Sequence, residues 1–274
     1  MSLLSVKNLS FSYNNRDTVL NDISFSVESG EHIALVGPNG SGKTTLFQLL
    51  SGYFSPAAGE VLLEDRDIRR YPIPERARRI AFVPQGGRIE FPYTCLETVL
   101  MGLHPHQGRS NLWFAEPRDG DALSRAAAIM RETGVWDLAG KSVTEISGGQ
   151  MQRLLLARAI LQTFPKEPEG SSSPAPKLLL LDETLSELDI AARIAMMKLL
   201  SRLVRDHRLT VIGIHHDLSL AYRFANRIIA LKEGEIAAEG APDAVCTPEF
   251  FARVFSVQAE IIPGKGFLFY DNLG

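Results

Sequence analysis

Short apolar runs separated by turn residues fill the first part of the chain, a pattern typical of β-strands. We expect strands at 3–9, 23–27, 32–36, 61–63 and 80–83. The run 32–36 leads directly into a glycine-rich loop, and a helical pattern follows at 44–50. The beginning of the chain therefore predicts strands, one of which is followed by a loop and a helix.

The later part of the chain alternates strands with helices. Residues 177–182 form a wholly apolar run that ends in acids, which is typical of a strand buried on both faces of a parallel sheet. The expected elements after it are strands at 211–214 and 227–231 and helices at 190–206 and 218–226. This alternation predicts a mostly parallel α/β core. The stretch from 95 to 162 is mainly helical in pattern and predicts an inserted helical lobe.

Composition narrows the possible classes of protein. The 274 residues, 45% of them hydrophobic, suffice for one large domain or for a domain with a smaller lobe. A net charge of −3 argues against nucleic acid as the main partner. Cys95 and Cys246 show no metal or redox spacing. The chain has no signal-peptide pattern and no run of about 18 apolar residues, so we expect it to serve any membrane process from the cytosol, bound to another protein.

The strongest chemical signal is the segment from Gly37 to Thr44, which fits G-x-x-x-x-G-K-[ST] between a strand and a helix. Its glycines allow backbone N–H groups to surround phosphate oxygens at a helix N-terminus. Lys43 is placed to reach the β- and γ-phosphates, and Thr44 to bind Mg²⁺. The predicted nucleotide-binding residues of this loop are Gly37, Pro38, Asn39, Gly40, Ser41, Gly42, Lys43, Thr44 and Thr45.

Two carboxylates, Asp182 and Glu183, follow the apolar strand at its C-terminal end, where ligand sites of α/β proteins lie. Asp182 is predicted to hold Mg²⁺, and Glu183 to polarise the water that attacks the γ-phosphate. A second glycine-containing helix start, Ser147-Gly148-Gly149-Gln150, predicts another phosphate site. A single nucleotide does not need two such sites from one chain, so we expect this one to contact the nucleotide of a neighbouring chain.

Together these segments resemble the nucleotide-binding subunits of the ABC transporter family. The loop at 37–44 resembles its Walker A motif, Ser147 to Gln150 its signature sequence, and Asp182–Glu183 its Walker B motif with the catalytic glutamate. The resemblance covers roughly residues 3–240. It implies an ATPase with ATP and Mg²⁺ as cofactors, built on a P-loop NTPase core with an N-terminal antiparallel β region and the helical lobe.

Four more residues match the family in order. Tyr13 resembles the aromatic residue that stacks on adenine, and Gln85 the glutamine that touches Mg²⁺ and senses the membrane partner. Asp189 resembles the D-loop residue that contacts the partner's nucleotide, and His216 the histidine that contacts the γ-phosphate. Taken singly, three of these features have plainer interpretations: Tyr13 as a core or surface aromatic, Gln85 as a loop amide, and His215 with His216 as a strand end at which the other histidine only packs.

The expected domains are an ABC ATPase domain at 1–240, with a helical lobe at about 88–162 and a flexible loop at 165–176, and a short C-terminal extension at 241–274. The chain departs from the family at Thr184-Leu185, where Pro-Thr is usual, and at Ile146, where leucine is usual. The first change is expected to alter the stiffness of the following loop. Neither change removes a chemical group, so hydrolysis is still expected.

Segments around Phe91, Val99, His104 and His216 resemble importers of iron chelates, haem and vitamin B12. That resemblance implies a homodimer at the cytoplasmic face of the membrane, beneath two transmembrane permease subunits fed by an extracytoplasmic binding protein. Zinc or manganese, molybdate and cobalt importers remain open as alternatives. A soluble, non-transport ABC ATPase is less favoured, because the chain has neither a long coiled coil nor a second core. A P-loop kinase is disfavoured by the signature sequence and His216.

Overall fold

The structure is a computed structural model and describes residues 2–14, 17–87, 89–106, 120–164, 177–262 and 266–270. The predicted flexible loop at 165–176 lies outside the described residues. The chain forms two compact units, one of Met1–Tyr71 with Leu200–Gly274 and one of Pro72–Leu199. The division falls within one long helix, α6 (Ile190–His207).

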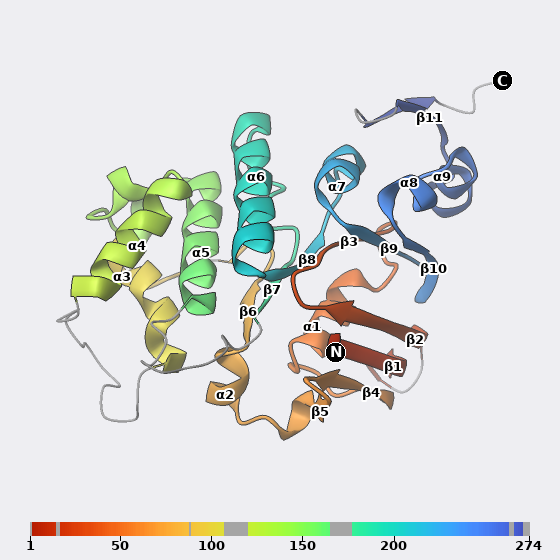
Figure 1. The fold of residues 1–274 in the computed structure, drawn as a ribbon, viewed down its shortest axis with the longest axis horizontal. Helices are drawn as coiled ribbons and strands as arrows, with labels where there is room; N and C mark the ends of the chain where they lie inside the picture. Colours follow the sequence, from red (N-terminus) through yellow and green to blue (C-terminus); the bar gives the residue numbers. More distant parts are fainter. Residues whose placement is uncertain are drawn as a thin grey trace. The chain divides into compact units, whose positions relative to one another are not determined.

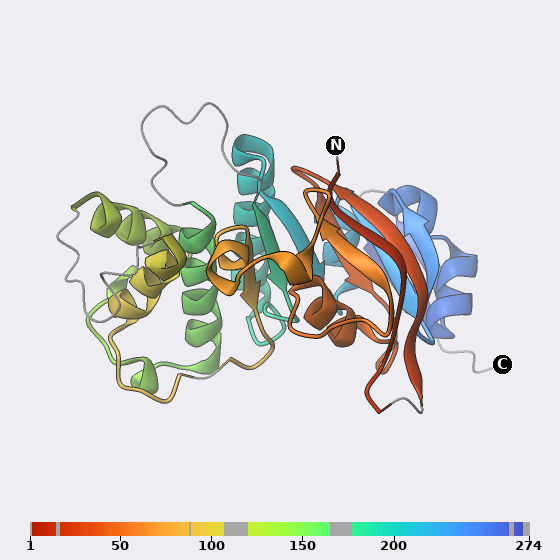
Figure 2. The same cartoon turned by 90° about the horizontal axis from the view of Figure 1, so that it is seen from below.

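An antiparallel sheet opens the first unit. Strand β1 (Ser2–Ser12) lies between β2 (Thr18–Glu28) and β4 (Ala58–Leu63), and β5 (Arg66–Asp67) pairs with β4 at the edge. Val6 pairs with Phe25 on one side and with Val61 on the other. Figure 2 shows these red and orange strands running beside one another. This sheet is the antiparallel N-terminal region that the sequence predicts.

Parallel strands form the centre of the first unit. Strand β3 (His32–Val36) runs parallel to β8 (Thr210–Ile214) on one side and to β9 (Arg227–Lys232) on the other. Strand β10 (Glu235–Gly240) returns antiparallel along β9. Every residue of β3 and β8 is buried, as expected for strands covered on both faces.

Helices cover both faces of these parallel strands. In Figure 1, α1 (Lys43–Leu50) lies on the face towards β1 and β2, and α7 (Leu218–Phe224), α8 (Pro242–Val245) and α9 (Pro248–Phe255) lie on the other. A hairpin of β11 (Gln258–Ile262) and β12 (Gly266–Tyr270) follows. Phe250 and Phe251 share a hydrophobic core with Ala34 and Val36 of β3. The segment after residue 240 therefore packs against the core of this unit, and the boundary at 240 stays a prediction.

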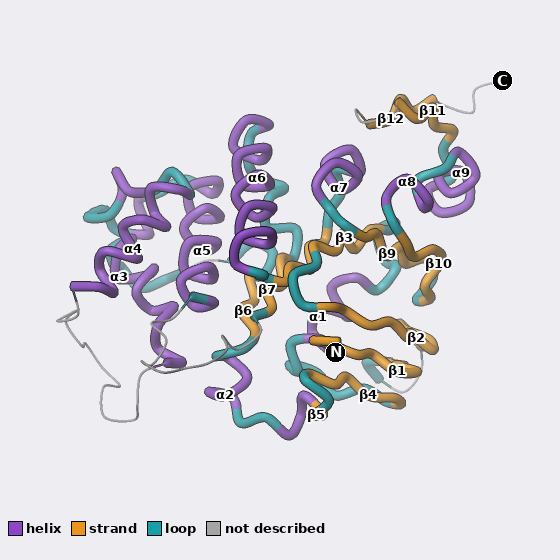
Figure 3. The backbone as a smooth tube through the Cα atoms, in the orientation of Figure 1, coloured by secondary structure: helices purple, strands orange, loops and turns teal. Residues whose placement is uncertain are grey.

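The second unit combines two parallel strands with a helical lobe. Strand β6 (Ile80–Val83) pairs in parallel with β7 (Leu178–Leu181). The bounds of β6 are those predicted, and β7 is one residue shorter at each end than the predicted run 177–182. Figure 3 shows the helices of the lobe in purple. The helical elements described here are α2 (Ile73–Ala77), α3 (Cys95–Leu100), η2 (Met101–His106), α4 (Gly120–Glu132), η4 (Trp136–Leu138), η5 (Val143–Glu145) and α5 (Gly148–Thr163).

Side chains of α3, α4 and α5 bury a core of their own. Cys95, Val99, Met130, Leu154 and Leu161 are among its buried members. Two capping boxes fix where α3 and α5 begin. In each, the cap hydroxyl accepts from the backbone N–H of the third helical residue, and the side chain of that residue, Glu97 or Gln150, accepts from the backbone N–H of the cap. Cys95 thus has a packing role, as does Cys246 in the core of the first unit.

Candidate functional site

The glycine-rich loop joins the buried strand β3 to α1 in the first unit. Gly37 and Gly42 have φ angles of 148° and 97°, which side-chain-bearing residues rarely adopt. A Cβ atom on Gly37 would lie 2.1 Å from the carbonyl oxygen of Leu231, so any larger residue would displace the loop. Gly42 is the N-cap of α1 and offers no side-chain cap. The loop therefore presents backbone at the helix N-terminus, the arrangement that phosphate binding needs.

Lys43 lies inside this loop. Its side chain is buried, and Nζ donates hydrogen bonds to the carbonyl oxygens of Gly37 at 2.9 Å and Pro38 at 2.8 Å. Ser41 is also buried, and its hydroxyl has no hydrogen-bond partner among the described residues. The loop thus holds a buried ammonium and a buried hydroxyl, and hydrogen bonds from such groups to an anion are strong.

Tyr13 is held at the edge of the same unit. Its hydroxyl lies 2.9 Å from the hydroxyl of Thr45, and its ring contacts Phe11 and Phe54 edge-on at 5.1 and 5.7 Å between centroids. The side chain is nevertheless 55% exposed. More than half of the side chain therefore stays open to solvent, and an aromatic ring with open surface is able to stack on a planar ligand.

The two acids follow β7 in the second unit. Asp182 is buried, and its backbone N–H donates to the carbonyl of Val83 at 2.9 Å. Glu183 has a φ of 48°, in the left-handed region. Its carboxylate accepts a hydrogen bond of 2.6 Å from the amide of Gln85. The structure therefore brings together the predicted base and one of the predicted metal ligands.

Thr184 is the residue at the predicted departure from the family. Its side chain is buried, and its hydroxyl donates to the carbonyl of Val83 at 3.2 Å. This bond ties the start of the following loop to the end of β6. The hydroxyl thus restrains the first residue of the loop, but it does not fix the φ angle as a proline ring would.

The signature segment begins α5. Ser147 caps the helix, its hydroxyl accepting from the N–H of Gln150, while the Gln150 amide oxygen accepts from the N–H of Ser147 at 2.9 Å. A Cβ atom on Gly148 would come within 2.7 Å of a carboxylate oxygen of Glu187. The structure thus places an acid of the 183–189 loop against the helix N-terminus, where negative charge is favoured.

Asp189 closes that loop. Its carboxylate accepts from the backbone N–H of Ala192 at 2.8 Å, which is the geometry of a helix cap at the start of α6. The sequence predicts a contact between this residue and the nucleotide of another chain. In the single chain, its observed role is to fix where α6 begins.

His215 and His216 follow β8 with different surroundings. The N–H of His215 donates to the carbonyl of Leu35 at 3.1 Å, so this segment continues along β3 towards the glycine-rich loop. The imidazole of His215 is buried, whereas His216 is exposed. The buried residue of the pair is thus His215, and the contact of His216 with the γ-phosphate stays a prediction.

The buried His215 lies near His32, a residue that the sequence did not single out. Their ring centroids are 6.0 Å apart. Burial lowers the pKa of His32 to about 4; burial, with nearby His32 and His216, lowers the pKa of His215 to about 3. Both imidazoles are therefore neutral at physiological pH. In the sequence, the signal for the pair of His32 and His215 is that His32 opens the apolar run 32–36, which is unusual for a polar residue.

Residues 20–186 match the sequence profile of the ABC transporter family, which is more than half of the chain. The chain belongs to the ABC transporter family. Among curated proteins, this ABC protein is 33% identical to the hemin import ATP-binding protein HmuV of Escherichia coli O157:H7 over 260 residues, covering 95% of this chain and 94% of that one. It is 36% identical to the ferric enterobactin transport ATP-binding protein FepC of Escherichia coli K12, and the match covers 89% of this chain and 84% of FepC.

Among solved structures, the ABC chain is similar to a subunit of a metal-chelate type ABC transporter in an inward-facing conformation. The TM-score is 0.77 at 28% identity, and the match covers 99% of each chain. The family, the fold class and the enzyme class predicted from the sequence, an ABC ATPase, are therefore confirmed.

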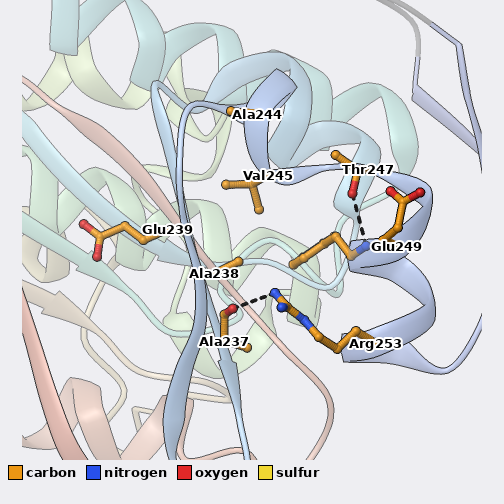
Figure 4. Close-up of a pocket in the computed structure, with 9 residues that line it drawn as sticks. Ala237, Ala238, Glu239, Ala244, Val245, Thr247, Glu249 and Arg253 are labelled. Carbon is orange, nitrogen blue, oxygen red and sulfur yellow. Dashed lines mark hydrogen bonds between the residues drawn. The ribbon is translucent and has the colours of Figure 1, made fainter.

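A shallow hollow of about 320 Å³ is found elsewhere in this ABC chain, between β10 and the helices α8 and α9 (Figure 4). Ala238, Val245 and Phe250 line it, and the guanidinium of Arg253 donates to the carbonyl of Ala237 at 2.7 Å. None of the predicted nucleotide-binding residues lines this hollow. Within the described part of the chain, no helix combines the length and apolar character needed to cross a membrane.

Proposed function

We propose that this chain is the ATP-hydrolysing subunit of an importer that takes up a metal chelate, such as an iron–siderophore, haem or cobalamin. The observation that carries the proposal is the match over 99% of both chains to the metal-chelate type transporter. The relatives named for hemin import and ferric enterobactin transport support the same class of cargo. The imported compound itself is not expected to touch this subunit.

The glycine-rich loop is proposed to hold the phosphates of ATP. Lys43 exchanges the carbonyls of Gly37 and Pro38 for the β- and γ-phosphate oxygens, which compete well because a charge-assisted bond is stronger than one to a neutral carbonyl. Residues 37–42 and Thr45 surround the phosphates, and all of them except Pro38, which has no N–H group, contribute backbone or side-chain donors. Tyr13 offers its exposed ring to adenine.

Glu183 is proposed as the base that orients and polarises the attacking water, with His216 contacting the γ-phosphate. Water is activated when its proton is drawn towards the carboxylate, so the carboxylate must hold one orientation. The hydrogen bond from Gln85 to Glu183 supports such an orientation.

Mg²⁺ is proposed to bind through Thr44, Gln85 and Asp182. Their hydroxyl, amide and carboxylate oxygens are hard donors of the kind that Mg²⁺ takes, together with waters and phosphate oxygens. Asp182 fits the part because it is buried directly after β7, next to Glu183 in the chain, so its carboxylate belongs to the same strand end as the proposed base. When bound, the ion would neutralise charge that develops on the phosphates.

A second copy of the chain is proposed to complete each site. Ser147, Gly148, Gly149, Gln150 and Asp189 would contact the nucleotide bound to the Walker A loop of the partner. The homodimer is proposed to sit at the cytoplasmic face of the membrane, bound to two permease subunits that receive cargo from an extracytoplasmic binding protein.

Reconstitution tests the proposal. The chain is purified with its permease in vesicles, and ATP hydrolysis and uptake are measured with haem, ferric siderophore, cobalamin, zinc, manganese, molybdate and cobalt. We expect uptake of one chelate, dependent on ATP. Uptake of a bare metal ion or of molybdate would select an alternative cargo class. A chain that binds no permease would instead favour a soluble ABC ATPase.

A further inference from the structure

The loop between Glu183 and Asp189 must be held without strand pairing, since it joins the end of β7 to the start of α6. The loop carries Thr184 at a position where the ABC transporter family usually has proline. The chain therefore lacks one fixed φ angle at this point. Loops without such restraints are mobile unless other bonds order them. The described contacts of the loop show where those bonds come from.

A single side chain, Arg193, binds three carbonyl groups of the loop. Its Nε donates to the oxygen of Leu185 at 3.2 Å, and one terminal nitrogen donates to the oxygens of Ser186 and Leu188, both at 3.1 Å. Arg193 is itself anchored, because its backbone N–H donates to the oxygen of Asp189 at 2.9 Å. The planar guanidinium suits this task, since its donors point in fixed directions.

The fixed part of the loop is bonded in turn to Glu183. The N–H of Ser186 donates to the carbonyl of Glu183 at 3.0 Å, and the Ser186 hydroxyl donates to the same oxygen at 2.7 Å. Glu183 has a left-handed φ of 48°, a conformation that persists only when its surroundings enforce it. A chain of hydrogen bonds therefore runs from Arg193 through Ser186 to the backbone of Glu183.

We propose that Arg193 is a positioning residue for ATP hydrolysis: by binding the carbonyls of the loop, it keeps Glu183 in the left-handed conformation in which its carboxylate meets Gln85. The proposal rests on the proposed role of Glu183 as the base. Without the guanidinium, the loop would relax and the carboxylate would lose its fixed direction, while nucleotide binding through the Walker A loop of the other unit would persist.

The kinetic test compares Arg193→Ala and Arg193→Lys with a matched control, Arg205→Gln. Arg205 lies on the same helix but is exposed and pairs with Asp206. For Arg193→Ala we expect the dissociation constant for ATP to stay within about twofold of wild type and kcat to fall by up to roughly 10²-fold, the scale of a misplaced catalytic group. Arg193→Lys keeps the charge but not the planar arrangement of several N–H donors, so its kcat should lie between those of wild type and Arg193→Ala. Arg205→Gln should match wild type.

A structural readout without nucleotide separates positioning from general damage. In Arg193→Ala, the amide hydrogens of Ser186 and Leu188 should exchange with solvent at least about tenfold faster than in wild type. The amide hydrogens of Leu179 and Leu180, within β7, should exchange as in wild type. If the alanine variant does not fold, the lysine variant carries both measurements, because it retains the cation.

Three results would overturn the inference. They are wild-type kcat in Arg193→Ala, unchanged exchange at Ser186 and Leu188, and a further loss of turnover when Arg193→Ala is added to Glu183→Gln. The last follows because a residue that acts through Glu183 has nothing left to position once that base is gone. Failure of the proposed base is recognised separately: Glu183→Gln alone would then retain wild-type turnover.

Discussion

The side-chain amide of Gln85 donates a hydrogen bond of 2.6 Å to the carboxylate of Glu183. The two residues are far apart in the chain but follow neighbouring parallel strands, with Val83 of β6 opposite Leu181 of β7. Their side chains therefore emerge at one edge of the strand pair. An amide offers both a donor and an acceptor, so Gln85 is able to serve Glu183 through its NH₂ group and a metal ion through its oxygen.

The first prediction follows from that contact. Gln85→Glu places a second carboxylate against Glu183, and like charges in close contact favour protonation of one of them. The acid limb of the kcat–pH profile should therefore move to higher pH than in wild type. Gln85→Leu is the control: it removes the donor without adding charge, so turnover should fall without that shift. Superimposable profiles for wild type and Gln85→Glu would mean that the two side chains do not meet in the active enzyme.

The second prediction concerns Glu183 itself. Glu183→Gln keeps the size and polarity of the side chain but removes the base, so ATP should still bind while turnover falls by about 10²–10⁴-fold. ATP that is bound but not hydrolysed should also hold two chains together, which size-exclusion chromatography with and without ATP measures. Full turnover by this variant would exclude Glu183 as the base.

Much of this architecture is predictable from the sequence, and particular residues show why the rest is not. The apolar run 32–36 and the glycines after it correspond to β3 and its loop, because burial and phosphate-loop geometry depend on local sequence. The hydrogen bond between Gln85 and Glu183 depends instead on which segments meet in space, because it joins the ends of two neighbouring parallel strands that are far apart in the chain. The helix α9 does have a local signal, because Thr247 caps it and Pro248 is its first residue. The sequence-based prediction for 241–274 is only a short extension, with no helix there.

The third prediction tests Lys43. Lys43→Ala removes the buried ammonium that bonds the loop carbonyls in the free chain and is proposed to bond phosphate in the complex. Bonds to a charged group are worth about 1.5–3 kcal/mol, so affinity for ATP should fall by roughly 10- to 100-fold, and turnover should fall with it. Lys198→Ala, at an exposed lysine, is the matched control. A fluorescent-nucleotide titration decides the matter, and equal affinity of the two variants would contradict the assignment.

The fourth prediction is a pH dependence of stability caused by His32 and His215. Their pKa values are lowered to about 4 and about 3 in the folded chain, against 6.5 for an ordinary histidine. Below pH 6.5 the unfolded chain binds protons that the folded chain does not, so stability falls as pH falls, until the folded pKa values are reached. Each histidine contributes a slope of about 1.4 kcal/mol per pH unit in that window.

Urea unfolding at pH 7 and pH 5 measures this slope. His32→Leu removes one of the two buried imidazoles and should roughly halve the part of the slope that the pair contributes. His104→Gln, at an exposed histidine, should leave the wild-type slope in place. An unchanged slope in His32→Leu would show that His32 is protonated equally in the folded and unfolded chains.

The last prediction is that hydrolysis needs two chains, each completing the other's site. Ser147→Arg places a bulky cation at the cap of α5, where Ser147 now bonds Gln150, and so blocks the site offered to a partner. Lys43→Ala disables the chain's own loop. Each variant should be inactive by itself. In a two-fold dimer of one variant with the other, one composite site carries both lesions and the other carries neither.

Mixing the two variants should therefore restore ATPase activity, up to about half of the wild-type rate per mixed dimer if one intact site turns over alone. If the two sites must alternate, mixing restores no activity, and the composite site is detected instead by ATP-dependent crosslinking between the loop of one chain and the signature segment of the other. The prediction fails if a strictly monomeric chain hydrolyses ATP at the full rate, with a rate per chain that depends neither on protein concentration nor on Ser147. A shared site requires both dependences, because half of its phosphate-binding groups come from the second copy.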